Sequence, residues 1–432
     1  MDRRWQLVLD CLDVEHAPFS KGTLVGFRQR LIAKDMDRRL IERTVEVAEQ
    51  TKAMGSRQLR AALDSSPLWG AGRVEDTYNL LGHALRKALR VLACQQGRGL
   101  AAQACEAGVP LLDGTRSLKA ALDCDWDDPV ERTAALEQVL VTLDTVEHQL
   151  ASQAAVPAAA VAALAIAQTV RDQDVVQHDD GPATLRQGVA KGRRISVEDA
   201  AMRHGRKSRS QRVDGYKRHV LRDLDSGLVR AVGLTPANAP EASVTDDLLA
   251  DLSRQAVQLH ELHIDRGYLA SPVVRDRPDD LLLFCKAWPV RTGDRYPKTA
   301  FVLNWAAGTM RCPNAVVIPF HPGATVHFPE QHCRLCPLRQ RCTTSVTGRS
   351  VHIHPDERLL QELRERQLTP LGRAKLRQRL PVEHALAHIG HWQGRRARYR
   401  GLRKNLFDLR RCAVVLNLHI LYREATHTPA AA

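Results

Sequence analysis

A chain of 432 residues is too long for one small domain, so we expect two or three units or a core with insertions. Its 63 Lys and Arg exceed its 49 Asp and Glu and leave a net charge of +14, which indicates a polyanionic partner because neutralised phosphates release counterions. The N-terminus lacks the apolar core of a secretory signal, and the uncharged stretch 151–170 is weakly apolar and contains Pro157, so we expect a cytoplasmic protein without a membrane span.

The first half of the chain is predicted to be mainly helical. Residues 1–57 are expected to form helices, and residues 58–65 a first strand that ends close to Asp64. Residues 75–175 follow, and they are predicted to be largely helical because alternating β-branched residues are rare there.

The second half alternates strands with helices. Segments 216–223 and 228–235 flank a Leu-Asp-Ser-Gly turn signal and predict a β-hairpin. A helix near 244–257 leads into an apolar strand that ends at Asp265, and a late helix carries Glu383.

Four of the ten cysteines have the spacing C-x20-C-x2-C-x5-C, and they are Cys312, Cys333, Cys336 and Cys342. Four thiolates at this spacing suit a tetrahedral structural zinc ion, and His332 or His327 can replace one ligand. The alternative is a metal-free unit in which reduced cysteines only pack, since one C-x2-C is a weaker signal than two. Short strand patterns nearby predict a small β-rich unit. The other cysteines are expected to be small buried apolar residues: Cys11, Cys94, Cys105, Cys124, Cys285 and Cys412.

Three acids stand where the fold can bring them together: Asp64 and Asp265 at expected strand ends, and Glu383 on a helix. Carboxylates are hard ligands for magnesium or manganese, and two such ions can activate the attacking oxygen and stabilise the leaving oxygen of a phosphodiester. Each acid has an ordinary alternative. Asp64 can be a cap or turn residue, and Glu383 a solvated charge beside its helix's apolar stripe. Asp265 is the strongest candidate, because sites on α/β folds lie at the ends of strands.

Four segments, in order, resemble the DDE transposases of bacterial insertion sequences. They are ALDSSPLWGAGRVEDTYNLL around Asp64, RISVEDAAMRHGRKS followed by DGYK, HIDRGY around Asp265, and VEH around Glu383 followed by RYRGLRKN. The resemblance spans about residues 18–423. It implies an α/β fold with an RNase H-like core, whose expected order is strand, hairpin, helix, strand and late helix. It also implies that Asp64, Asp265 and Glu383 form a DDE triad. The triad would bind two Mg²⁺ or Mn²⁺ ions for the cleavage and strand transfer of DNA ends.

The same resemblance implies DNA contacts. Arg379 matches the arginine of the family's Y-R-E-K signature, whereas Leu376 occupies the tyrosine position and Gly390 the lysine position, so those two contacts are not carried over. Two basic runs offer replacements: residues 191–222 hold eleven Lys or Arg against three acids, and residues 395–411 hold eight against one. The alternative for both runs is a solvated basic face. The predicted DNA-binding residues are Arg379, Arg395, Arg396, Arg398, Arg400, Arg403, Lys404, Arg206, Lys207 and Lys217.

Four parts are expected along the chain. They are a helical N-terminal region at 1–57, the first part of the core at 58–290 with a helical insertion at about 80–180, a Cys-rich β insertion at 291–355, and the helical end of the core at 356–432. Similar transposases recognise terminal repeats with the N-terminal region; this one begins abruptly, and we expect part of it to be absent.

The expected partner is double-stranded DNA, both the terminal inverted repeats and the target, held by a homodimer. Two alternatives stay open. One is a catalytically silent DNA-binding protein derived from a transposase, and the other is an RNase H-like nuclease that cuts without strand transfer.

Overall fold

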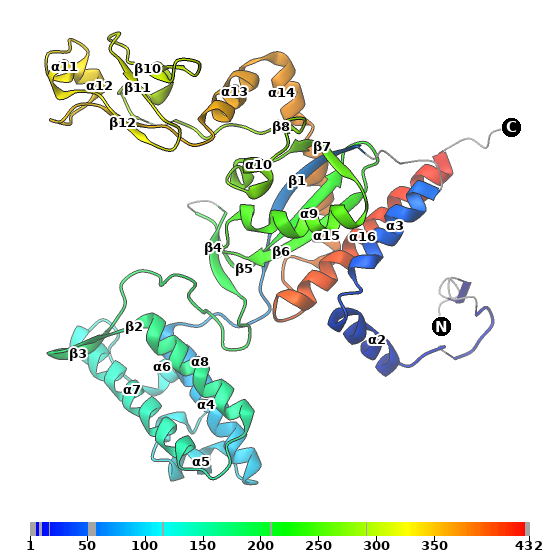
Figure 1. Cartoon of the computed structure of the whole chain (residues 1–432). Helices are drawn as coiled ribbons and strands as arrows, with labels where there is room; N and C mark the ends of the chain where they lie inside the picture. The colour runs from blue at the N-terminus through cyan, green and yellow to red at the C-terminus, as the bar shows by residue number, and fades with distance from the viewer. Residues whose placement is uncertain are drawn as a thin grey trace.

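The structure is a computed structural model that describes residues 6–7, 11–16, 18–50, 58–114, 116–207, 210–290 and 292–427. Parts of the expected N-terminal region, residues 1–5, 8–10, 17 and 51–57, therefore lie outside the described residues. The chain forms a central sheet with helices, a helical unit and a small β unit (Figure 1). The α/β class predicted from the sequence is confirmed at this level.

A mixed sheet forms the centre of the molecule, and β1 is its middle strand. β1 pairs antiparallel with β5 and parallel with β7; β5 also pairs with β4 and β6, and β7 with β8. The expected hairpin is β5 and β6, and its turn is closed by the Asp223 carboxylate, which accepts from the backbone N–H of Asp225. The strands are β1 (Gln58–Trp69), β4 (Arg203–Arg206), β5 (Arg212–Asp223), β6 (Val229–Pro236), β7 (Gln258–His263) and β8 (Leu282–Phe284).

Strand β1 is longer than the sequence predicts, and this changes the position of Asp64. β1 does not end near residue 65, because its antiparallel pairing with β5 continues to Trp69. Its parallel pairing with β7, however, stops at Ala62. Asp64 therefore lies inside β1, just past the point where β7 leaves it.

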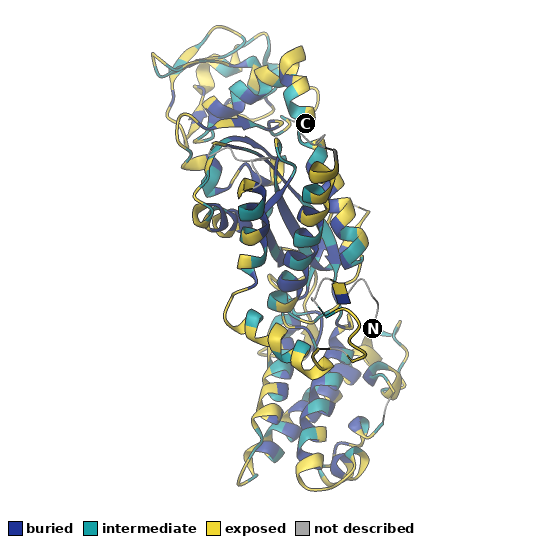
Figure 2. Ribbon diagram, turned by 90° about the vertical axis from the view of Figure 1, so that its right-hand side faces the viewer, coloured by how far each residue is buried: buried dark blue, intermediate teal, exposed yellow. Residues whose placement is uncertain are grey.

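Helices cover both faces of the sheet. Leu59 and Leu63 of β1 pack with residues of α9 and α13 on one face, and Ala62 packs with α3, α15 and α16 on the other. Figure 2 shows buried residues in this sandwich and also in the helical unit. The helices of the sandwich are α3 (Arg38–Gln50), α9 (Thr245–Arg254), α10 (Pro272–Arg275), α13 (Glu357–Leu368), α14 (Pro370–Arg377), α15 (Leu380–Gln393) and α16 (Leu402–His427).

Two helices described in the N-terminal region are α2 (Lys21–Ala33) and α3, and a buried ion pair at Asp37, just before α3, links α3 to α16. The fully buried carboxylate of Asp37 accepts from Arg403 and from Arg410, whose side chain is 2% exposed. Helix α3 therefore belongs to the layer that covers the sheet.

The helical unit has its own hydrophobic core, in which α4 packs against α7 and α8. The weakly apolar stretch 151–170 contributes most of α8, which packs along α4. Among the described residues, no helix is both long and apolar enough to cross a membrane. The elements are α4 (Thr77–Gln95), α5 (Leu100–Glu106), η1 (Pro110–Leu112), α6 (Leu118–Ala121), α7 (Pro129–Ala151), α8 (Ala158–Asp174), β2 (Val175–His178) and β3 (Gly181–Leu185).

The small β unit forms around Phe301, Phe320 and Phe328, three aromatic residues that are at most 4% exposed. Its β13 leads by a short connection into α13, so this unit stands beside the end of the sheet that carries β7 and β8 (Figure 1). The elements are η4 (Lys298–Ala300), β9 (Val302–Asn304), β10 (Thr309–Arg311), β11 (Val317–Pro319), β12 (Thr325–His327), α11 (Glu330–Arg334), α12 (Arg339–Cys342) and β13 (Ser350–His352).

Candidate active-site cleft

Three acids from distant parts of the chain line one cleft of about 1300 Å³, which we call the main cleft. Asp64 comes from β1, Asp265 from the turn after β7, and Glu383 from the first turn of α15. The parallel pairing of β1 with β7 brings the two aspartates to neighbouring positions, and α15 packs across β1 and β5. The fold thus assembles the three acids that the sequence singled out.

Local structure fixes each acid. Asp265 caps the short helix η3 (Arg266–Tyr268), because its Oδ1 accepts from the backbone N–H of Gly267 at 2.8 Å. Glu383 is exposed on the flank of α15, whose apolar stripe is buried as predicted. The stripe consists of Val382, Ala385, Leu386 and Ile389.

Arg379 lies between two of the acids. Its guanidinium donates to the carboxylate of Asp64 and, over 2.7 Å, to Oε1 of Glu383. Burial raises the pKa of Asp64 to about 6 even though the Arg379 charge acts to lower it, and the negative charges of Asp265 and Glu383 add to the rise. The three carboxylates are therefore close enough to repel one another, and Arg379 offsets part of that repulsion.

A fourth acid, Glu241, lines the same cleft and was missed by the sequence reasoning. It begins η2 (Glu241–Val244), and its Oε1 accepts from the Ser65 hydroxyl at 2.6 Å, beside Asp64. A Cβ atom placed on Gly267 would overlap the Glu241 carboxylate. The Glu241 side chain can therefore lie here only because residue 267 is glycine. The sequence signal was faint: a glutamate in a turn after a strand.

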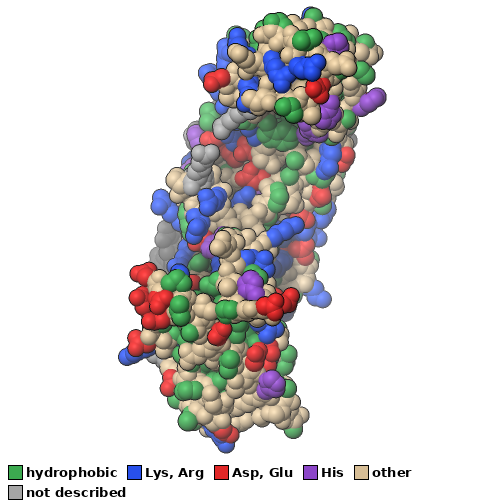
Figure 3. Space-filling view, turned by 90° about the vertical axis from the view of Figure 1, so that its left-hand side faces the viewer, with side chains coloured by type: hydrophobic (Ala, Val, Ile, Leu, Met, Phe, Trp, Pro, Cys, Tyr) green, Lys and Arg blue, Asp and Glu red, His purple; other side chains and the backbone are tan. Residues whose placement is uncertain are grey.

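Several predicted DNA-binding residues also line the main cleft, namely Arg206, Lys207, Lys217, Arg379 and Arg395. Arg395 reaches it because the segment after α15 continues the sheet: Trp69 donates its N–H to the Arg395 carbonyl, and Ala397 donates to that of Trp69. On the face seen in Figure 3, Lys and Arg side chains gather around a recess between the two outlying units.

Most of the basic run at 395–404, all of which is described, lies elsewhere. Arg395 is the only one of its cations that lines the main cleft, and Lys404 is exposed outside it. The other four predicted contacts hold the fold together. Arg396 donates to the Gly70 carbonyl, Arg398 to the Trp392 carbonyl, Arg400 pairs with Glu198, and Arg403 pairs with Asp35 and Asp37. These four arginines therefore have partners within the protein, and their predicted role in DNA binding stays a prediction.

The run at 191–222 is also partly structural. Arg218 is buried, and it donates to the Ser66 hydroxyl, the Pro67 carbonyl and Gln393; burial lowers its pKa to about 10. Its guanidinium lies 3.4 Å from where a Cβ of Gly390 would stand, so an arginine from β5 lies beside Gly390.

The four spaced cysteines converge. Cys312, Cys333, Cys336 and Cys342 line one cavity of about 30 Å³ in the small β unit, together with His332. Burial raises the pKa of Cys342, and the other three thiols add to the rise. Across the described part of the chain, no group of three or more His, Cys, Asp or Glu side chains stands in an arrangement that could hold a metal ion.

The expectation that the other cysteines are buried is wrong for two of them. Cys285 and Cys412 are buried, but Cys94 and Cys105 are exposed. Cys94 and Cys105 lie on the outward faces of α4 and α5, because residues such as Leu92 and Ala104 occupy the inward faces of these helices.

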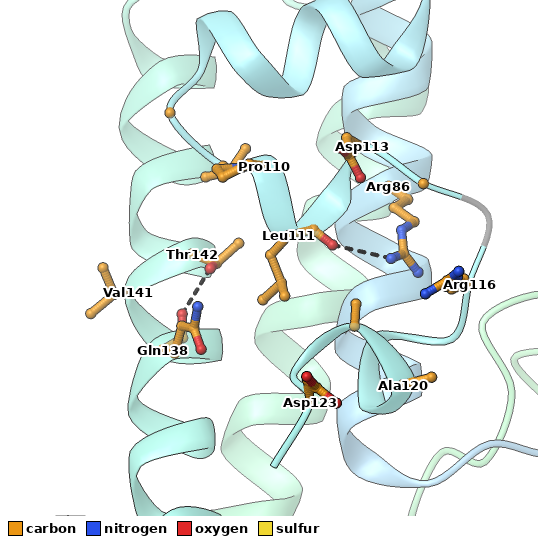
Figure 4. A pocket seen from close by; sticks show the side chains of 14 residues that line it. Arg86, Pro110, Leu111, Asp113, Arg116, Ala120, Asp123, Gln138, Val141 and Thr142 are labelled. Carbon is orange, nitrogen blue, oxygen red and sulfur yellow. Dashed lines mark hydrogen bonds between the residues drawn. The ribbon is translucent and has the colours of Figure 1, made fainter.

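A further large hollow, of about 1090 Å³, lies in the helical unit (Figure 4). Arg86 donates there to the Leu111 carbonyl at 3.2 Å, and burial lowers its pKa. None of the three acids lines this hollow, so it is separate from the main cleft.

Comparison with known families gives two matches. Two family models, both described as Transposase DDE domain, match residues 179–281 and residues 321–422. The first range contains Asp265 and the second contains Glu383, whereas Asp64 lies before both. No curated protein and no solved structure matches the chain.

Proposed function

Because this chain belongs to the DDE transposases, we propose that it cleaves the DNA ends of a mobile element and transfers them to target DNA, with Asp64, Asp265 and Glu383 as its catalytic acids. The observation that carries the proposal is the single cleft lined by these three residues, which come from β1, the end of β7 and α15. The element order agrees with an RNase H-like core, which we infer for the central sheet.

Three carboxylates are by their chemistry a donor set for a hard divalent cation, although the described side chains do not stand in an arrangement that could hold one. Two Mg²⁺ or Mn²⁺ ions held by these carboxylates would activate the attacking oxygen and stabilise the leaving oxygen of a phosphodiester. Arg379 binds one oxygen of Asp64 and one of Glu383, and we propose that it moves aside when the two acids bind metal together. Once displaced, the Arg379 guanidinium remains beside the acids, where it can bind a phosphate group.

The rest of the main cleft suits a nucleic-acid backbone. Arg206, Lys207 and Arg395 present cations beside the acids, and a protein that neutralises phosphates gains affinity by counterion release. We infer that double-stranded DNA, comprising the terminal repeats and the target, binds along the side of the main cleft that carries these cations. Cleavage of two paired ends would use two copies of the chain, so we expect a homodimer on DNA.

The test is a cleavage assay with a labelled duplex that spans the boundary of the element that encodes the chain. The unaltered protein should cut at the boundary in the presence of magnesium. Asp265→Ala and Glu383→Ala should each abolish cutting while leaving DNA binding largely intact. The matched control is Glu365→Ala, an exposed helical glutamate on α13, which should cut normally. Cleavage by the Asp265→Ala protein would refute the assignment.

The products separate the remaining alternatives. Joining of the freed 3′ ends to a second duplex indicates a transposase. Free 3′-hydroxyl ends without joined product indicate a nuclease. Binding without any cutting indicates a silent DNA-binding protein.

A further inference from the structure

A second cleft, of about 730 Å³, opens on the other side of the acids. We call it the far cleft. It shares Asp265, Arg379 and Glu383 with the main cleft, and the rest of its lining is different. The main cleft extends toward β4 and β5, whereas the far cleft extends toward β8 and α14. Because β1 and β7 stand between β5 and β8 in the sheet, the two clefts meet at the acids from opposite directions.

The far cleft is basic. Besides the shared Arg379, its cations are Arg266, Lys286, Arg373 and Arg377, all exposed, and its only acids are the shared Asp265 and Glu383. None of these four cations forms an ion pair with another described residue. By contrast, Arg60 and Lys375 nearby are both paired with Glu261. Arg373 also donates to the Leu368 carbonyl at 2.6 Å, but none of the four cations has an acidic partner among the described residues, and cations gathered in this way around one hollow suit an anionic ligand.

Rigid elements present these cations. Arg373 and Arg377 stand one turn apart on α14, so they share a face of that helix. Arg266 follows Asp265 directly in η3, and Lys286 follows β8. Helix α14 is linked to the sheet, because Lys375 of α14 donates to Glu261 of β7 at 3.1 Å. All four cations are exposed at the far cleft, two of them on α14 and two close to the ends of β7 and β8.

We propose that the far cleft binds the DNA on the opposite side of the scissile phosphodiester from the DNA held in the main cleft. This inference rests on the proposed function, since a phosphodiester positioned at the shared acids must have DNA continuing from it in both directions. A strand that leaves the acids away from the main cleft enters the far cleft, where it meets Arg266, Lys286, Arg373 and Arg377.

The test compares two double variants. Lys286→Ala with Arg377→Ala removes two far-cleft cations that make no side-chain hydrogen bond or ion pair with a described residue. Arg90→Ala with Arg132→Ala removes the same charge from exposed positions in the helical unit. Binding of a labelled boundary-spanning duplex is measured without divalent ions, so that no cutting occurs. The far-cleft variant should bind on the order of tenfold more weakly at about 0.1 M salt and lower the slope of log affinity against log salt by about 1.8. The control variant should match the parent.

Two truncated duplexes locate the effect. Each lacks the DNA on one side of the cutting position. The far-cleft variant should bind one of them as tightly as the parent does and the other more weakly, and a main-cleft variant, Lys207→Ala, should show the reverse. The inference is overturned if the far-cleft substitutions leave binding of the full duplex unchanged, or if both variants lose their effect on the same truncated duplex. Failure of the proposed function is a separate result, because it shows as absence of cutting by the parent protein.

Discussion

Replacing Glu261 with glutamine should cost stability through the loss of a buried charge. Glu261 lies on β7 with its side chain 4% exposed, 2.6 Å from His263. It also accepts from Arg60 of β1 at 3.2 Å and from Lys375 of α14 at 3.1 Å. One carboxylate thus ties the strand that leads to Asp265 to the strand of Asp64 and to the helix before Glu383.

The pKa of Glu261 gives the size of its contribution to the free energy of unfolding. Burial acts to raise this pKa, but the bonds from His263, Arg60 and Lys375 outweigh burial and lower it from 4.5 to about 2. At 1.36 kcal/mol per unit, the ionised carboxylate contributes about 3 kcal/mol to folding. Because the folded-state pKa is the lower one, this contribution is complete well above pH 4.5 and is lost as the pH falls toward 2.

The assay is urea unfolding of both proteins, followed by far-ultraviolet circular dichroism across a pH series. The free energies of unfolding of the parent and Glu261→Gln should differ by about 3 kcal/mol at neutral pH and by about 2 kcal/mol near pH 3.5. The control is Glu362→Gln, which removes a half-exposed ion-pair partner and should cost less than about 1 kcal/mol. A gap between parent and Glu261→Gln that stays constant over this range would refute the reasoning.

Three further changes test other parts of the structure. Glu241→Gln keeps an acceptor for the Ser65 hydroxyl but removes a negative charge beside Asp265, so cleavage should need more magnesium while the unfolding midpoint stays unchanged; equal magnesium titrations would contradict this. Asp37→Ala leaves Arg410 buried without its main partner, so the free energy of unfolding should fall by about 3 kcal/mol or more; a loss below about 1 kcal/mol in urea unfolding would argue against it. Although the four thiols do not stand in a metal-holding arrangement here, the zinc hypothesis from their spacing predicts that the purified chain contains zinc by elemental analysis and that Cys336→Ser loses it; a metal-free parent would refute that hypothesis.

The arginines show most clearly where sequence reasoning stops. Arg395 and Arg403 lie eight residues apart in the same basic run, and nothing local distinguishes them. Arg403 forms an ion pair with Asp37, which lies 366 residues earlier in the chain, whereas Arg395 lines the main cleft. Whether a cation is free or paired depends on partners that only the folded chain brings near.

The glutamates show the same limit. Glu383 stands in a segment that resembles a known family, so its candidacy was visible in the sequence. Glu241 has no such segment, and it became a candidate only because the turn after β6 places it between Ser65 and Gly267.

The sequence by itself determined the α/β class, the hairpin of β5 and β6 and the buried stripe of α15, because these depend on local patterns of side chains, and it offered the three candidate acids through the resemblance of the segments around them. Only the tertiary structure decided that β1 runs on past Asp64, that Arg379 stands between Asp64 and Glu383, and that a second basic cleft meets the first at the acids. The reason is physical: strand pairing, ion pairing and the walls of a cleft are made between residues hundreds of positions apart, and a linear pattern does not record which of them meet.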